Sequence, residues 1–124
     1  MKMEQILTQD FLDTLIPPET GDRFFEALYG DASEGAYDIR LKFLNSDKKQ
    51  IVLAFDLTER PGKCLMCSLT YGLPTVFSRH PLINIKKIVE KIEEKGISVK
   101  KWYLGETREL NSSNHAIPFY LDLA

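Results

Sequence analysis

The chain has 124 residues, of which 44% are hydrophobic and 27% are charged, and its formal net charge at pH 7 is −2. This length is typical of one domain, and this composition is typical of a folded globular protein and excludes a disordered one. The small negative charge excludes a strong overall attraction to nucleic acid or anionic membranes, and no apolar run reaches the roughly 18 residues of a transmembrane helix.

The N-terminal part of the chain predicts two helices. Apolar residues within 4–16 recur at helical spacing, and Pro17 and Pro18 end this segment because proline lacks a backbone N–H. A second helix is expected at about 19–29. The first residues lack the apolar core of a signal peptide, which predicts a cytoplasmic location and reduced cysteines.

After residue 36 the apolar residues recur with a period of two, which predicts strands. The alternating segments are 37–43, 51–57 and 65–71, followed later by 97–104 and 115–123. Turn residues at 45–48 favour a hairpin between the first two strands. Pro118 predicts that the last strand lies at an edge of the sheet, because proline cannot donate to a ladder of hydrogen bonds.

The clearest helical pattern lies between Pro81, which suits a first helical position, and Gly96, which suits the end of a helix. The predicted order of elements is therefore α-α-β-β-β-α-β-β. We expect an α+β fold in which two N-terminal helices and a later one pack on one face of a mostly antiparallel five-stranded sheet. Residues 1–124 would form this as a single domain.

Cys64 and Cys67 form a Cys-x-x-Cys motif, which is found in redox sites, in zinc sites and by chance among buried residues. If residues 65–71 are a strand, the two side chains lie about 10 Å apart along the chain and point to opposite faces. A disulfide needs Cα atoms within about 7 Å. The strand interpretation therefore excludes a disulfide and a shared metal, whereas a short helix would bring the two sulfur atoms together.

Twelve residues separate Cys67 from His80, as in zinc fingers, but the second histidine expected shortly after His80 is absent. His115 would have to supply the fourth ligand. A zinc site formed by Cys64, Cys67, His80 and His115 is thus the alternative to the main expectation, which is a protein without a cofactor.

The sequence gives little support for catalysis. A cysteine with His80 or His115 and Asp56 would supply the groups of a cysteine hydrolase, but no spacing requires this arrangement. No nucleophile-elbow, dinucleotide-binding, Walker or His-Glu-x-x-His motif occurs. We therefore expect a protein that is not an enzyme.

Lysines accumulate after residue 85 and predict a basic patch that also includes Arg79 and Trp102. The residues that would contact a phosphate backbone are Lys86, Lys87, Lys91, Lys100 and Lys101. The α-β-β-β-α core is similar in element order to a double-stranded-RNA-binding domain. Glutamates at 90, 93 and 94 dilute the patch, so nucleic-acid binding is a second alternative and not the main expectation.

The loop at 71–77 is unusually apolar for a connecting segment, and it either covers the core or meets a partner. The candidate binding residues are Tyr71, Leu73, Val76, Phe77, Arg79 and His80. The order of elements also resembles that of secretion chaperones, although their closing helix is missing here. This resemblance implies a homodimer that binds an extended peptide.

These patterns favour a non-enzymatic binding or adaptor module. Its partner would be a protein or peptide, met by the apolar loop, by an exposed edge strand or by both. A metal or thiol site at Cys64, Cys67 and His80 is the first alternative, and nucleic-acid binding through the lysines is the second. No membrane partner is expected.

Overall fold

The structure, a computed structural model, describes residues 3–29, 37–60, 77–78, 83–111 and 113–124. Within these residues one antiparallel sheet is formed by β1 (Tyr37–Ser46), β2 (Gln50–Glu59), β3 (Val99–Leu104), β4 (Arg108–Glu109) and β5 (Asn114–Leu123). The strand order is β1-β2-β5-β3, and β4 also pairs with β5. The predicted α+β class with an antiparallel five-stranded sheet is therefore confirmed.

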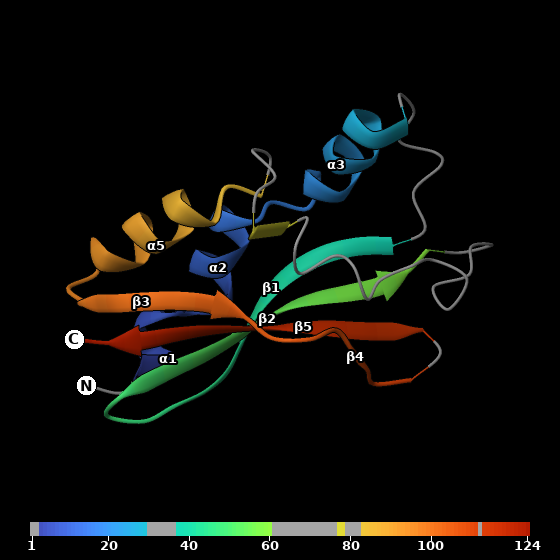
Figure 1. The fold of residues 1–124 in the computed structure, drawn as a ribbon. Helices are drawn as coiled ribbons and strands as arrows, with labels where there is room; N and C mark the ends of the chain where they lie inside the picture. The colour runs from blue at the N-terminus through green and yellow to red at the C-terminus, as the bar shows by residue number, and fades with distance from the viewer. Residues whose placement is uncertain (1–2, 30–36, 61–76, 79–82, 112) are drawn as a thin grey trace.

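The described helices are α1 (Met3–Ile6), α2 (Gln9–Leu15), α3 (Thr20–Tyr29) and α5 (Ile85–Glu93). Helices α2, α3 and α5 lie over the same face of the sheet (Figure 1). The first predicted helix is divided in two, because the Thr8 side chain caps α2 by accepting a hydrogen bond from the Phe11 N–H. The second predicted helix, at 19–29, corresponds closely to α3.

The core lies between the helices and one face of the sheet. Period-two alternation directs every second side chain of β1, β2 and β5 inward. The buried residues of these strands include Ile39, Leu41, Ile51, Leu53, Phe55, Leu57, Ile117, Phe119 and Leu121. The apolar stripe of α5 (Ile85, Ile88, Val89 and Ile92) covers them from the helical side. This burial of apolar surface is the main term that stabilises the fold.

Helix α5 starts four residues later than the sequence predicts. Asn84 is its N-cap, and the Asn84 side chain accepts a hydrogen bond from the Lys87 N–H at 3.3 Å. Asn84 adopts a left-handed conformation with φ of 49°, which asparagine tolerates better than most residues. Pro81, which the sequence predicts at the first helical position, lies outside the described residues.

The last strand is central, which corrects the expectation that Pro118 marks an edge. Strand β5 pairs with β2 on one side and with β3 and β4 on the other, and Pro118 lies opposite Ala54. The Pro118 carbonyl accepts a hydrogen bond from the Gly105 N–H at 2.8 Å. The nitrogen and carbonyl of one residue point to the same side of an antiparallel strand. The missing N–H of Pro118 thus faces the interruption between β3 and β4, where the ladder loses little.

The predicted strand at 65–71 lies outside the described residues. Between the last two predicted strands, the structure contains the additional strand β4, whose Arg108 and Glu109 pair with Ala116 and His115. With β4, the described residues form a sheet of five strands.

Candidate functional site

Most residues of the predicted binding loop and of the Cys-x-x-Cys motif lie outside the described residues. They are Cys64, Cys67, Tyr71, Leu73, Val76, Arg79 and His80. Their roles as a zinc or thiol site, or as a binding surface, therefore stay predictions. Among the residues that the structure does describe, no three His, Cys, Asp or Glu side chains gather in a way that could hold a metal ion.

Phe77 is described, and it belongs to the core rather than to an exposed binding loop. Its side chain is fully buried, and its ring makes edge-to-face contacts with Phe24 and Phe55 at centroid distances of 5.4 Å. Such aromatic pairs stabilise a core beyond the area that they bury. This corrects the expectation that Phe77 contacts a partner, since a fully buried ring offers no surface to one.

His115 and Asp56 lie on opposite faces of the sheet, so they do not form the paired groups of a hydrolase. His115 is only 1% exposed and stands opposite Leu57 on the core side. Asp56 pairs with Ala116, the next residue of β5, on the outer side. Side chains of neighbouring residues on a strand point in opposite directions. Asp56 therefore does not orient the imidazole of His115, which would be the base in such a site.

The five lysines proposed for nucleic acid do not share one face. Lys86, Lys87 and Lys91 are exposed on α5, above the helical side of the sheet. The Lys101 ammonium lies 3.7 Å from the Asp122 carboxylate on the outer face. Lys100 is exposed at a bulge in β3. The sheet separates Lys101 from the lysines of α5, so a single phosphate-binding surface would have to use only part of the set.

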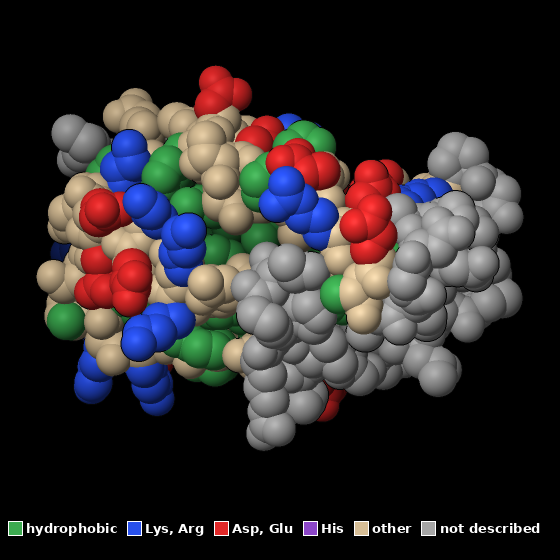
Figure 2. All heavy atoms as spheres, turned by 90° about the horizontal axis from the view of Figure 1, so that it is seen from above, with side chains coloured by type: hydrophobic (Ala, Val, Ile, Leu, Met, Phe, Trp, Pro, Cys, Tyr) green, Lys and Arg blue, Asp and Glu red, His purple; other side chains and the backbone are tan. Residues whose placement is uncertain are grey.

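A cleft of about 540 Å³ lies in the helical layer, and we call it the helical cleft. Its walls are α2, the first turn of α3 and the N-terminal half of α5. It is lined by Phe11, Thr14, Leu15, Pro17, Glu19, Thr20, Arg23, Ile83, Asn84, Lys87, Ile88 and Lys91. Figure 2 looks onto this side of the molecule and shows apolar side chains lying between lysines, arginines and acids.

The floor of the helical cleft is apolar and its rim is mainly cationic. Phe11 and Leu15 are only partly buried although they pack against the core. Among the described residues of the rim, the cations Arg23, Lys87 and Lys91 outnumber the one acid, Glu19. Lys91 has an ion-pair partner in Glu94 at 3.5 Å, whereas Arg23 and Lys87 form no ion pair with any residue that the structure describes. Within the described residues, the cleft thus combines partly exposed apolar surface with positive charge that forms no ion pair.

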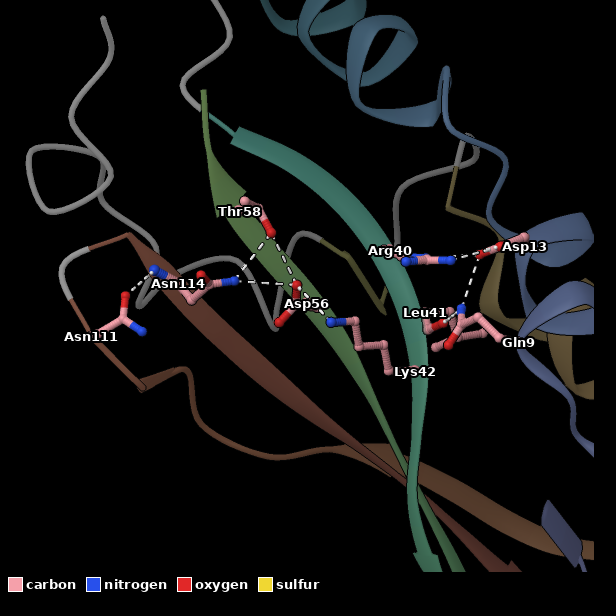
Figure 3. Close-up of polar contacts among 9 residues, drawn as sticks. All are labelled: Gln9, Asp13, Arg40, Leu41, Lys42, Asp56, Thr58, Asn111 and Asn114. Atoms are coloured by element: carbon pink, nitrogen blue, oxygen red, sulfur yellow. Dashed lines mark hydrogen bonds and ion pairs between the residues drawn. The ribbon is translucent and has the colours of Figure 1, made fainter. Parts of the chain in front are cut away.

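The outer face of the sheet carries a second polar cluster, centred on Asp56 (Figure 3). The Asp56 carboxylate accepts hydrogen bonds from the Thr58 hydroxyl at 3.0 Å and the Asn114 amide at 3.3 Å. The Lys42 ammonium lies 3.6 Å away. Every group of this cluster is partnered within it, so it joins β1, β2 and β5 and leaves little to offer a ligand.

A third polar group closes the free edge of β1. The Gln9 amide donates to the Leu41 carbonyl at 2.8 Å and to the Asp13 carboxylate at 2.9 Å (Figure 3). Asp13 also receives two hydrogen bonds from Arg40. These contacts place α2 along the edge strand, so this part of the edge does not accept another strand. The strand that the sequence proposes as an exposed edge, at 115–123, is the central strand β5 and offers no free edge to a peptide.

Comparison of the chain with models of protein families, with curated protein sequences and with solved structures finds no match. The resemblance to secretion chaperones and to double-stranded-RNA-binding domains thus gains no support from them. No helix in the described ranges is both long and apolar enough to cross a bilayer.

Sequence reasoning did not identify the helical cleft. A partial signal was present, because Lys87 and Lys91 are four residues apart and therefore neighbours on one side of a helix. The position of Arg23 across the cleft depends on how α3 packs relative to α5. No spacing along the chain contains that information.

Proposed function

We propose that this protein is a non-enzymatic binding module that holds a segment of another protein in the helical cleft. The observation that carries the proposal is the combination of a partly exposed apolar floor, formed by Phe11 and Leu15, with the charges of Arg23 and Lys87, which form no ion pair with any described residue. Exposed apolar surface rimmed by polar residues is typical of protein interaction sites. Unpaired charges at the rim increase the rate and specificity of association.

The chemistry of the cleft favours binding over catalysis. Among its described lining residues there is no histidine or cysteine, and the only acid, Glu19, is exposed. General acid–base or nucleophilic catalysis needs an activated side chain with a partner in hydrogen-bond reach. Two threonines and three cations without a buried acid do not supply that pair.

The shape of the cleft favours a polypeptide over a small molecule. A volume of about 540 Å³ lies within the range of about 300–1,000 Å³ found for ligand sites. Small-molecule sites, however, bury about 70–90% of the ligand. The helical cleft is open, since Thr14, Glu19, Arg23, Lys87 and Lys91 are all exposed. A chain that continues beyond both ends of the cleft suits such an open site.

Site-specific photocrosslinking in the native cell tests this proposal. A photoreactive amino acid at Thr14, an exposed residue of the cleft wall, is expected to capture a distinct protein. The same amino acid at Lys48, in the exposed β1–β2 turn, serves as the control. The captured protein, once purified, should bind the wild type and lose affinity for a variant carrying Arg23→Glu and Lys87→Glu. Equal capture at both positions, or binding that the variant retains, contradicts the proposal.

A further inference from the structure

We infer that the segment held in the helical cleft is an amphipathic helix with two carboxylates one turn apart. This inference rests on the proposed function and names the chemistry of the partner. It follows from the spacing of the cations, the apolar character of the floor and the hydrogen bonding of the backbone around the cleft.

The cations of α5 define the spacing of the carboxylates. Lys87 and Lys91 line the same side of the helix and are separated by about one turn, or about 5–6 Å between Cβ atoms. Two acids at positions i and i+4 of a helix have the same separation. A partner helix running alongside α5 can therefore place one carboxylate against each lysine. Arg23, on the opposite wall, is available to a third acid or to the terminal carboxylate of such a helix.

The charge around the cleft selects acids and disfavours bases. Lys95 adds a further cation beside it, because its ammonium lies 4.6 Å from the ring centroid of Phe11. Lys91 is partly satisfied by Glu94 at 3.5 Å, on exposed side chains where such a pair is weak and exchanges readily. A partner carboxylate competes with Glu94 on equal terms. A partner lysine would instead face four cations, and of the described acids only Glu19 and the already paired Glu94 could bind it.

The floor requires apolar side chains at helical spacing. Phe11 and Leu15 lie four residues apart on α2 and form one ridge, and Ile88 faces them from α5. A ridge between two helices accepts the side chains of a third helix at positions such as i, i+3 and i+4. This is the pattern of an amphipathic helix.

The backbone around the cleft favours a helix over an extended peptide. An extended segment needs backbone hydrogen-bond partners, as in addition to a sheet edge. The described lining of the cleft contains no strand, and only the helix ends in it leave backbone groups without a partner inside the helix. The edge of β1 nearest to α2 is occupied at Leu41 by the Gln9 side chain. A helix satisfies most of its own backbone groups and binds mainly through side-chain contacts, which these walls offer.

Selection from a randomised peptide library tests the inference with the full chain as the target. The library displays helix-forming peptides in which both apolar and charged positions vary. The selected peptides are expected to carry apolar residues at helical spacing together with two acids four residues apart. Their affinity for the protein variant that carries both Arg23→Glu and Lys87→Glu should be about tenfold or more below their affinity for the wild type. Exposed charge pairs contribute modestly, and reversing the two charges adds repulsion.

A matched control separates the cleft from a general charge effect. Lys86 is exposed on the same helix but does not line the helical cleft. Lys86→Glu changes the net charge by the same amount as Lys87→Glu and disturbs α5 to a similar extent. We expect Lys86→Glu to change peptide affinity less than twofold, while Lys87→Glu alone weakens it severalfold. Binding should also weaken as salt rises, because the contacts are exposed ion pairs.

Three results would overturn the inference. The first is a set of selected peptides that lack acidic residues. The second is a set of acidic peptides whose affinity for the variant with Arg23→Glu and Lys87→Glu equals their affinity for the wild type. The third is a library that yields no binding peptide. If Thr14 still captures a protein in the cell under any of these results, the proposed binding function stands and only the chemistry assigned to the partner fails. If Thr14 captures nothing either, the binding function fails with it.

Discussion

Arg40 on β1 holds Asp13 on α2 through two parallel hydrogen bonds. The Arg40 Nε lies 3.1 Å from Asp13 Oδ1, and Arg40 Nη2 lies 3.0 Å from Asp13 Oδ2. The Gln9 amide donates to the same carboxylate, and these three side chains fasten α2 to the edge of the sheet. One wall of the helical cleft is thus fixed in place by contacts outside the cleft.

The Asp13 carboxylate should make stability depend on acid pH. The hydrogen bond from Arg40, and next the one from Gln9, lowers the pKa of Asp13 below its ordinary value of 3.8. A lowered pKa in the folded state adds stability above about pH 4, and this contribution is lost as the pH falls through the folded pKa. The effect is small, since the Arg40 and Asp13 side chains are 52% and 32% exposed. Urea midpoints of wild type and Asp13→Asn should differ at pH 7 and converge near pH 2. A difference that persists at pH 2 would show that the charge is not its cause.

Asn84 should be sensitive to substitution for two separable reasons. Asn84→Ala removes the cap of α5 and places an alanine at φ of 49°, which together cost about 2 kcal/mol. Asn84→Gly also loses the cap but accepts the left-handed conformation freely, so it should cost only about 0.5 kcal/mol. Urea denaturation measures both changes. A glycine variant as unstable as the alanine variant would argue against the left-handed conformation.

Phe77→Ala should destabilise the protein strongly. The ring is fully buried between Phe24 and Phe55, and truncating such a side chain typically costs about 3–5 kcal/mol. Leu110→Ala is the control, because Leu110 is largely exposed and its truncation should cost less than about 0.5 kcal/mol. Equilibrium unfolding in urea compares them. If both variants are as stable as the wild type, Phe77 is not part of the core.

Two substitutions of Asp56, on the outer face of the sheet, should separate the contribution of its hydrogen bonds to stability from that of its ion pair. Its side chain is only 10% exposed and accepts from Thr58 and Asn114. Asp56→Ala removes the acceptor of the Thr58 hydroxyl and one of the two acceptors of the Asn114 amide, which also donates to Thr58 at 3.1 Å, and it should cost about 1–3 kcal/mol. Asp56→Asn keeps an acceptor oxygen and loses only the attraction to the half-exposed Lys42, so it should cost less than about 1 kcal/mol. The reverse order of the two variants would indicate that the ion pair is the larger contribution.

Local sequence patterns were sufficient to predict those helices and strands whose pattern of apolar residues lies within the element itself. The alternation at 37–43 and 51–57 predicts β1 and β2 with the correct faces, and the apolar stripe of α5 predicts the side that it buries. In the β1–β2 turn, Asp47 accepts hydrogen bonds from the N–H groups of Lys49 and Gln50, as turn chemistry leads one to expect. Each of these features depends on residues within a few positions of one another.

Element boundaries were less predictable, because caps compete with periodicity. The apolar pattern at 4–16 continues through the position at which Thr8 ends one helix and starts the next. Similarly, α5 begins directly after Asn84, whose side chain caps it, and the apolar periodicity does not mark this residue. Differences of this kind amount to about 1 kcal/mol, which is too little for a pattern to resolve.

What the sequence alone determined is the class of the fold, the faces of β1, β2, β5 and α5, and the chemical character of their exposed residues. The tertiary structure decided which elements and side chains lie next to one another. It placed the proline-containing strand β5 at the centre, buried Phe77, set Lys101 and Lys87 on different sides of the sheet, and brought Arg23 to the cleft beside Lys87. The physical reason is that periodicity reports which side of an element is apolar. Which elements meet depends on how those apolar sides cover one another, and that is a property of the whole core.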